Sequence, residues 1–215
     1  MDVMRAPVAA AILAGGEARR MGGVNKAGLR IGAERMLDRQ LRLLRLVADP
    51  VFIVSSRADV EAAAVEIVPD AVDGAGPLGG IYTALRHSPH ARTLVVGCDL
   101  PFLTKALLDR LTAPSAAQVV IPRTARGYEP LCATWSADCA DVIYHRIRGG
   151  KLKAALALDG LRVEEIGPEL LATCDPRGLL FMNVNTPHDH ERARRLSREE
   201  SKSLRDRIMD VSEDS

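Results

Sequence analysis

Short apolar runs alternate with amphipathic segments along most of the chain. The first run, residues 8–13, ends close to a pair of glycines. Over residues 35–47 leucines recur at positions 37, 41 and 44 with arginines between them, which predicts a helix with one buried face. Strands that are apolar throughout and separated by helices are typical of a parallel sheet covered on both faces. Further strands are predicted at 51–54, 65–68, 94–97, 119–122 and 130–135, and helices at 59–64, 79–86 and 104–111.

The last third of the chain has a less regular pattern. Thr186 as N-cap, Pro187 at the first helical position and Asp189 at the third predict the start of a final helix. Residues 197–215 are mostly charged or serine, which indicates a frayed helix or a disordered tail. We therefore predict one domain over residues 1–196 and a charged C-terminal tail. Before the final helix, the pattern predicts helices at 136–148 and 151–158 and strands at 161–166 and 181–184.

The fold class that follows is α/β. We expect a single-domain three-layer α/β/α sandwich around a mostly parallel, Rossmann-like sheet. At 47% hydrophobic and 27% charged residues, the 215-residue chain has the composition of an ordinary globular protein. Its 29 basic and 28 acidic residues leave a net charge of only +1, which argues against a protein that works by coating DNA or an anionic membrane.

The cysteines and the apolar runs indicate the compartment. Cys98, Cys132, Cys139 and Cys174 form no Cys-x-x-Cys pair, so reduced thiols are favoured over a zinc site or a disulfide framework. No apolar stretch reaches the roughly 18 residues needed to span a bilayer. We expect a cytoplasmic protein whose partners include neither nucleic acid nor membrane.

The candidate chemistry lies where the predicted strands end. In an open parallel sheet, ligands bind beyond the carboxyl ends of the strands. A glycine loop, cations and two carboxylates collect at that edge, which is the equipment of a magnesium–nucleotide site. The residues concerned are Leu13, Ala14, Gly15 and Gly16 with Arg20 and Lys26 after the first strand, Ser55 after the second, Asp70 after the third and Asp99 after the fourth.

The first loop is the most informative segment. Gly15 and Gly16 let backbone amides approach an anion, and Arg20 and Lys26 can neutralise phosphate charge. The spacing matches neither a Walker A loop nor Gly-x-Gly-x-x-Gly. A plain glycine-rich turn with solvated cations is the alternative. The fixed order of Arg20, Met21 and Lys26 favours the phosphate site.

The two carboxylates have structural alternatives as well. Asp99 is well placed to hold Mg²⁺ beyond the sheet edge, or else caps a turn before Pro101. Asp70 can accept hydrogen bonds from a guanine, or else starts a turn. Residues 76–80 can open a helix whose amino end faces the nucleotide. A cluster formed by Arg192, Arg194 and Arg195 is either a solvated face or part of a site for a phosphorylated second substrate.

Seven motifs carry a resemblance to a known family. At these motifs the chain resembles the molybdenum cofactor guanylyltransferases, a nucleotidyltransferase family, over about residues 8–195. The resemblance implies a nucleotide-diphospho-sugar transferase-like fold. The motifs are LAGG at 13–16, RMGG at 20–23, Lys26, GPLGG at 76–80, CDLPF at 98–102, EPLCATW at 129–135 and NVNTP at 183–187.

The resemblance also implies an activity. Members transfer GMP from GTP to molybdopterin or Mo-molybdopterin and release pyrophosphate. By position, Arg20, Lys26 and Asp99 are then the catalytic residues, and Asp99 is the Mg²⁺ ligand. The resemblance further implies that the nucleotide is bound by the backbone of Leu13, Ala14, Gly15 and Gly16, together with Ser55 and Asp70. The molybdopterin side takes Asn183, Asn185 and residues 151–153, and transient contact with molybdopterin-synthesis or molybdoenzyme proteins is expected.

Some positions depart from the family pattern and leave alternatives open. Asn25 stands where an aspartate often precedes the lysine, and Ser55 lies where a base-binding asparagine is often found. Cytidylyltransferases tend to carry LAAG in the first loop, so Gly15 favours GTP. The alternatives are a molybdopterin cytidylyltransferase, a sugar-phosphate nucleotidyltransferase, and a non-enzymatic GTP-binding adaptor of a molybdoenzyme.

Overall fold

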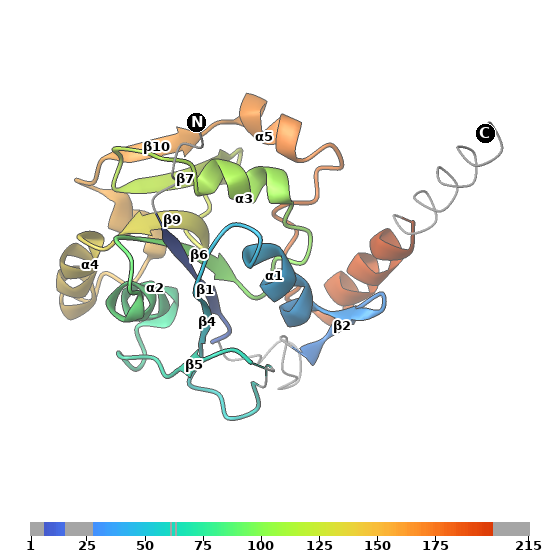
Figure 1. Cartoon of the computed structure of the whole chain (residues 1–215), viewed down its shortest axis with the longest axis horizontal. Helices are drawn as coiled ribbons and strands as arrows, with labels where there is room; N and C mark the ends of the chain where they lie inside the picture. Colours follow the sequence, from blue (N-terminus) through green and yellow to red (C-terminus); the bar gives the residue numbers. More distant parts are fainter. Residues whose placement is uncertain (1–6, 16–27, 61, 63, 200–215) are drawn as a thin grey trace.

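A single mixed sheet forms the centre of the computed structural model, which describes residues 7–15, 28–60, 62 and 64–199. The described residues give this sheet eight strands in the order β10-β7-β9-β6-β1-β4-β5, with β8 paired to β7 (Figure 1). The strands are β1 (Val8–Leu13), β4 (Val51–Val54), β5 (Ile67–Val68), β6 (Arg92–Gly97), β7 (Val119–Thr124), β8 (Gly127–Tyr128), β9 (Cys132–Ser136) and β10 (Val163–Ile166).

The direction of the strands decides which loops meet. β1 pairs in parallel with β4 and β6, and β4 with β5, so these four strands end at one edge. β9 runs antiparallel to both β6 and β7. Because Cys132 at the start of β9 pairs with Val96 near the end of β6, the loop before β9 arrives at the same edge.

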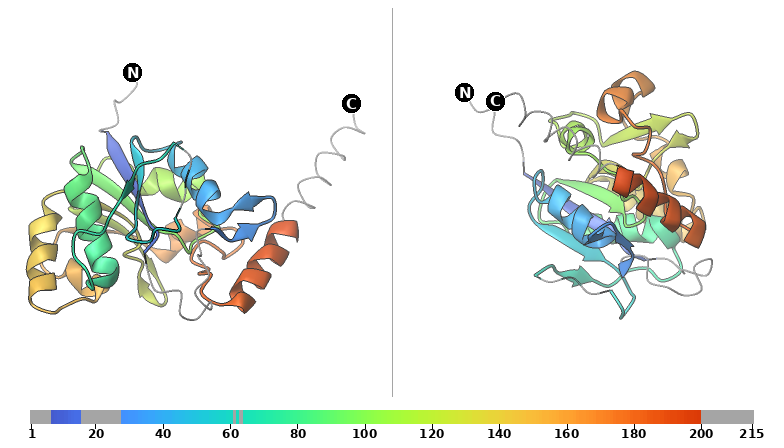
Figure 2. Two further views of the ribbon diagram at one scale, coloured as in Figure 1. Left: turned by 90° about the horizontal axis from the view of Figure 1, so that it is seen from below. Right: turned by 90° about the vertical axis from the view of Figure 1, so that its right-hand side faces the viewer.

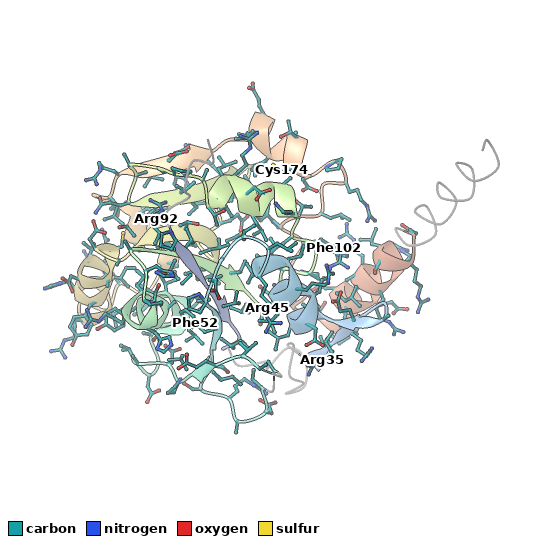
Figure 3. The ribbon with its side chains drawn as sticks, viewed as in Figure 1. Arg35, Arg45, Phe52, Arg92, Phe102 and Cys174 are labelled. Carbon is teal, nitrogen blue, oxygen red and sulfur yellow. The ribbon has the colours of Figure 1, made fainter. Side chains whose placement is uncertain are left out.

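Helices cover both faces of the sheet, as expected for a three-layer α/β/α sandwich (Figures 1 and 2). One face packs against α1 (Met36–Leu44), α3 (Lys105–Leu111) and α5 (Pro168–Cys174). The other packs against α2 (Gly76–His87), α4 (Cys139–Arg148) and the 3₁₀ helix η3 (Ala154–Leu158). Phe52 on β4 and Cys174 on α5 lie in the cores on the two opposite faces of the sheet (Figure 3).

Local sequence explains the helices well. Leu37, Leu41 and Leu44 are buried on one side of α1, as their spacing predicts. The Thr104 hydroxyl accepts a hydrogen bond from the Leu107 amide and caps α3. At the start of the helix over 187–199, Thr186 Oγ1 accepts from the Asp189 amide, and Asp189 Oδ2 accepts from the Thr186 amide, which is a reciprocal capping box.

A third, smaller core lies beside the sandwich. The strands β2 (Arg30–Ile31) and β3 (Glu34–Arg35) form a hairpin that the helix over 187–199 covers (Figure 2). Ile31, Met36, Phe102, Val184 and Ala193 are buried together there. This packing joins the last described helix to the segment that follows the first loop.

Two predicted elements are wrong. Residues 181–184 do not form a strand, because the Val184 amide donates to the backbone oxygen of Asp99 instead of joining a ladder. The described residues of 59–64 do not form a helix, and Ala64 has a φ of 55°, which a right-handed helix excludes.

The remaining expectations about elements agree with the structure apart from their ends. The helix predicted at 136–148 begins only at Cys139, and that at 151–158 is a 3₁₀ helix from Ala154. The four cysteines are buried, and none of them is in a disulfide bond. Within the described ranges, the search for a helix long and apolar enough to cross a membrane finds none.

Candidate functional site

The end of β1, where the first loop starts, and the turn after β6 are neighbours, as the sequence predicts. Leu13 pairs with Gly97 in the parallel ladder, and the Cys98 amide donates to the backbone oxygen of Leu13 over 3.1 Å. On the other side of β1, the Ala14 amide donates to the backbone oxygen of Val54 over 2.9 Å. The start of the first loop is therefore fixed between β4 and the turn that carries Asp99.

Asp99 is half-buried beyond the end of β6. A Cβ at Gly97 would lie 2.8 Å from Asp99 Oδ1, so only a glycine leaves the carboxylate in this position. The backbone oxygen of Asp99 accepts from the Val184 amide over 3.0 Å, which ties the turn to the chain before the last helix. The geometry presents this carboxylate at the edge where the strands end.

The amino end of α2 closes against the same edge. The helix begins at Gly76, and a Cβ at Gly80 would lie 2.9 Å from Leu13 Cδ1 at the end of β1. The glycine therefore allows the first turn of α2 to approach the first loop. Residues 76–80 therefore open a helix, as expected, and that its amino end faces a nucleotide stays a prediction.

Asp70 follows β5 and is bound to α2. Thr83 Oγ1 lies 2.9 Å from Asp70 Oδ1, and the Asp70 amide donates to Ser56 Oγ over 3.0 Å. Burial raises the pKa of the Asp70 carboxyl and Asp73 adds to this, while the hydrogen bond from Thr83 opposes it. The Asp70 side chain is half-buried, and its hydrogen bond with Thr83 sets its orientation.

The buried Ser55 has its hydroxyl engaged within the protein. Ser55 Oγ donates to the backbone oxygen of Ala14 over 3.2 Å and accepts from the Arg57 amide over 3.1 Å. These contacts hold the first loop against the loop after β4. Ser55 therefore lies beside the predicted nucleotide loop, and its hydroxyl holds the start of that loop at Ala14.

Glu129 and Arg126 are two charged residues at this edge to which the sequence analysis assigns no role. Glu129, in the loop before β9, accepts from Thr124 Oγ1 over 3.3 Å and lies 3.7 Å from the Arg126 guanidinium. Burial raises the pKa of the Glu129 carboxyl, and the charge of Asp99 also acts in that direction against Arg126 and Thr124. Glu129 opens the motif at 129–135, but only the antiparallel direction of β9 shows that it lies near Asp99.

The residues Asn183 and Asn185 line one pocket, called here the Asn183 pocket. It has a volume of about 590 Å³. The Arg126 guanidinium donates to the backbone oxygen of Phe181 over 3.0 Å at its wall, and Arg192 lines it from the last helix. Its described lining also includes Thr124, Asp175, Gly178, Leu179, Phe181, Met182 and Asp189.

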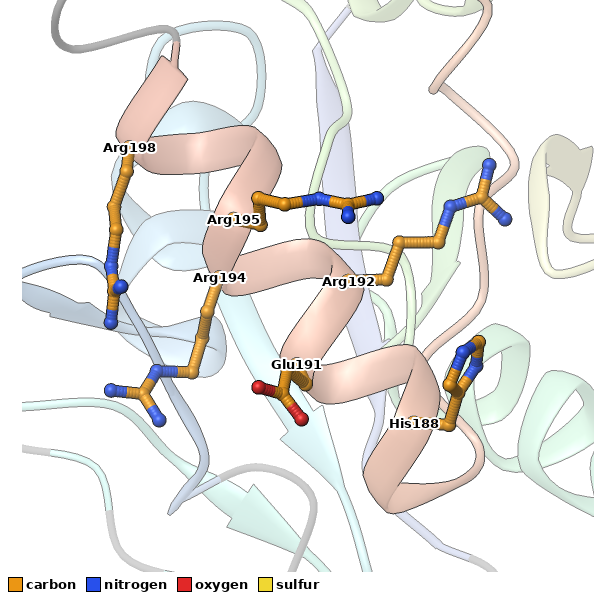
Figure 4. A pocket seen from close by; sticks show the side chains of 6 residues that line it. All are labelled: His188, Glu191, Arg192, Arg194, Arg195 and Arg198. Carbon is orange, nitrogen blue, oxygen red and sulfur yellow. The ribbon is translucent and has the colours of Figure 1, made fainter.

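Arg192 also lines a second, smaller pocket of about 390 Å³ along the last helix. Figure 4 shows Arg192 extending to the opposite side of this helix from Arg194 and Arg198. Arg192, Arg194 and Arg195 line this second pocket together, and of the three only Arg192 also lines the Asn183 pocket.

Some predicted residues have no structural test. Gly16, Arg20 and Lys26 lie outside the described residues. Residues 151–153 are exposed between α4 and η3, and they do not line the Asn183 pocket. Among the residues that the structure describes, no group of three His, Cys, Asp or Glu side chains is arranged to hold a metal ion.

Comparison with known proteins shows the family. The model of the MobA-like NTP transferase domain matches residues 10–165. A molybdenum cofactor guanylyltransferase from Desulfosudis oleivorans is 34% identical over 185 residues, which cover 85% of this chain and 92% of that protein. These findings confirm the resemblance carried by the motifs.

Solved structures agree with the sequence comparison. The crystal structure of molybdopterin-guanine dinucleotide biosynthesis protein A from Archaeoglobus fulgidus has a TM-score of 0.75 at 26% identity, covering 89% of this chain and 99% of that one. A Mycobacterium tuberculosis protein in complex with manganese shares the fold, with a TM-score of 0.59 at 16% identity over 87% of this chain and 97% of its own. The chain therefore belongs to the family of MobA-like NTP transferase domains and, within it, to the molybdenum cofactor guanylyltransferases.

Proposed function

We propose that this protein transfers the guanylyl group of GTP to the terminal phosphate of molybdopterin or Mo-molybdopterin and releases pyrophosphate. The observation that carries the proposal is the contact between the loop after β1 and the turn after β6, through the Cys98 amide and the Leu13 carbonyl. A triphosphate lying on the first loop is thereby brought beside the Asp99 carboxylate. The similarity to molybdenum cofactor guanylyltransferases supports the choice of substrates.

The nucleotide occupies the β1, β4 and β5 side of the edge. The backbone of Leu13, Ala14, Gly15 and Gly16 approaches the phosphates, and Ser55 supports this loop from below. Asp70, oriented by Thr83, accepts hydrogen bonds from the N1–H and amino group of guanine. Lys26 and Arg20 neutralise phosphate charge.

Asp99 holds the divalent cation, Mg²⁺. A single carboxylate would suit this ion, because Mg²⁺ at nucleotide sites is generally held by one or two carboxylates together with substrate phosphates and water. When bound, the cation neutralises charge on the phosphates. The glycine at position 97, which leaves space for the carboxylate oxygen, supports this assignment.

The acceptor occupies the Asn183 pocket. Asn183 and Asn185 offer amide donors and acceptors, and Arg126 and Arg192 offer guanidinium groups that match a phosphate. The bond between the Val184 amide and the Asp99 carbonyl supports this arrangement, since it joins the pocket to the nucleotide side. Residues 151–153 do not line this pocket, and their lysines would contribute only positive charge at longer range.

The reaction is an in-line displacement at phosphorus. An oxygen of the acceptor phosphate attacks the α-phosphorus of GTP, and the bond from that phosphorus to the bridging oxygen of the β-phosphate breaks. No general base is needed, because a phosphate nucleophile is already ionised near neutral pH. Arg20, Lys26 and the loop amides stabilise the charge that develops on the α-phosphate and on the leaving pyrophosphate.

A pyrophosphate-release assay with GTP or CTP, each with and without molybdopterin, tests the proposal. We expect release only with GTP and molybdopterin together. Asp99→Asn should abolish it, and Asp109→Asn, which weakens the ion pair with Lys105 on α3, should not. Consumption of CTP instead, or GTP binding by isothermal titration without pyrophosphate release, would contradict the proposed activity.

A further inference from the structure

Gln40 is a buried polar residue on the apolar side of α1. Its exposed fraction is 1%, and it lies on the same side of the helix as Leu37, Leu41 and Leu44. Spaced at i, i+3, i+4 and i+7, these four positions form the stripe that packs on the sheet. An amide in this stripe costs free energy unless it is hydrogen-bonded. Its contacts therefore show why a polar residue is present.

The Gln40 amide binds the turn that carries Asp99 on both sides. Gln40 Nε2 donates to the backbone oxygen of Gly97 over 2.8 Å and to that of Leu100 over 3.0 Å. The two acceptors bracket Cys98 and Asp99. The orientation of the amide is fixed, because the opposite one would place its oxygen against two carbonyl oxygens.

The hydrogen-bonding groups of the Gln40 side chain are only partly satisfied. Its Oε1 is buried and has no hydrogen-bond partner among the described residues. A leucine in its place would complete the apolar stripe and would leave no such oxygen. The side chain is therefore poorly explained by packing and well explained by the two carbonyls that it holds.

The other contacts of the turn come from the strands and loops around it. The Gly97 amide donates to the Leu131 carbonyl, the Cys98 amide to the Leu13 carbonyl, and the Asp99 carbonyl accepts from Val184. None of these bonds involves the carbonyls of Gly97 and Leu100. Gln40 thus supplies the contact from the α1 layer that stops the turn from tilting away from the first loop.

We propose that Gln40 is a positioning residue for the metal-binding carboxylate. By holding the Gly97 and Leu100 carbonyls, it fixes the turn so that Asp99 faces the triphosphate and its cation. The inference rests on the proposed function, because it takes Asp99 as the metal ligand. Outer contacts that orient a metal ligand typically change metal affinity by roughly 10- to 100-fold.

The test compares Gln40→Met with Asp99→Asn and Thr93→Val. Methionine has a similar length and cannot donate the two bonds. Thr93 lies at the far end of β6, is fully buried and has an unpartnered Oγ1, so its variant controls for removing a buried polar group from the same region. Mn²⁺ binding to the protein with GTP is measured by electron paramagnetic resonance, and GTP binding without metal by isothermal titration.

We expect Gln40→Met to weaken Mn²⁺ binding at least about tenfold while metal-free GTP binding stays within twofold of the wild type. Thr93→Val should change neither. If Gln40→Met does not fold, Gln40→Glu serves instead, because a carboxyl group of the same shape loses at least one of the two donated bonds.

Three results would overturn the inference. A folded Gln40 variant with wild-type Mn²⁺ affinity, when Asp99→Asn has lost it, refutes the role of Gln40 alone. An equal loss of Mn²⁺ and metal-free GTP binding shows general damage to the site. Wild-type Mn²⁺ affinity in Asp99→Asn refutes the assignment of Asp99 itself, and the role of Gln40 with it.

Discussion

Thr83 Oγ1 lies 2.9 Å from Asp70 Oδ1 and thereby links the second turn of α2 to the loop after β5. The same oxygen lies 3.0 Å from the Gly79 carbonyl and accepts from the Ala71 amide over 2.9 Å. One buried hydroxyl therefore connects the helix to the segment that carries the carboxylate. The orientation of Asp70 depends on this residue.

Thr83→Val should weaken GTP binding without unfolding the protein. Loss of a hydrogen bond to a carboxylate costs about 1.5–3 kcal/mol at most, so we expect a rise in the Kd for GTP of roughly 10-fold. Thr112→Val is the matched control, because the Thr112 hydroxyl likewise donates to the backbone oxygen four residues earlier, that of Leu108 on α3. It has no carboxylate partner among the described residues. Isothermal titration that gives both variants the same Kd would show that Thr83 does not orient Asp70.

Asp70→Asn should make the protein more stable at neutral pH and weaken GTP binding. Burial raises the pKa of Asp70, so the folded state disfavours the charged carboxylate relative to the unfolded chain. The cost is fully present above the folded pKa and is relieved as the pH falls through it. The gain in Tm from the substitution should therefore shrink on acidification, which thermal melts from pH 7 down to pH 4 will follow. A gain that grows toward low pH would contradict the assigned sign.

Gly97→Ala should weaken activation by Mg²⁺ more than it lowers the stability of the fold. The new Cβ would lie 2.8 Å from Asp99 Oδ1, so the carboxylate must move. We expect the Mg²⁺ concentration for half-maximal rate to rise about tenfold or more. Gly167→Ala is the control, since a Cβ there meets nothing within 4 Å and its φ of −74° suits any residue. Identical Mg²⁺ titrations for the two variants would remove the argument for Gly97.

Arg192→Ala should raise the KM for molybdopterin and leave the KM for GTP unchanged. Arg192 lines the Asn183 pocket, and a guanidinium–phosphate contact is worth about 1.5–3 kcal/mol, or roughly 10- to 100-fold in KM. Arg194→Ala, on the other side of the same helix, should change neither constant (Figure 4). Steady-state rates at varied acceptor concentration measure the difference. An equal effect of the two substitutions would indicate a general electrostatic contribution and no specific contact.

The positions of Asp70 and Asp99 at the sheet edge can be predicted from the sequence, because strand ends determine them. The apolar runs locate β1, β4, β5 and β6, and Asp70 and Asp99 follow two of them directly. Their meeting at one edge is a general property of parallel strands. Local pattern was therefore sufficient to place these two side chains.

The rest depends on tertiary contacts that local pattern does not encode. The residues of β9 are as apolar as those of a parallel strand, so its reversed direction, which brings Glu129 to Asp99, is invisible in the sequence. Residues 181–184 resemble a strand, but the Asp99 carbonyl binds Val184. Gln40 did leave a signal, since a lone amide interrupts the leucine stripe of α1.

The reversal at β9 also divides the sheet into two parts. On one side of the β6–β9 boundary lie the parallel strands whose ends carry Leu13, Asp70 and Asp99, and on the other lies the β7–β8 hairpin with Arg126. In the proposed function, the residues that bind the donor and those that bind the acceptor therefore lie on separate parts of one sheet. Because the two cores run across this boundary, changes that exchange the acceptor side would have to lie in the loops around β7 and β9 and leave the buried faces of these strands intact.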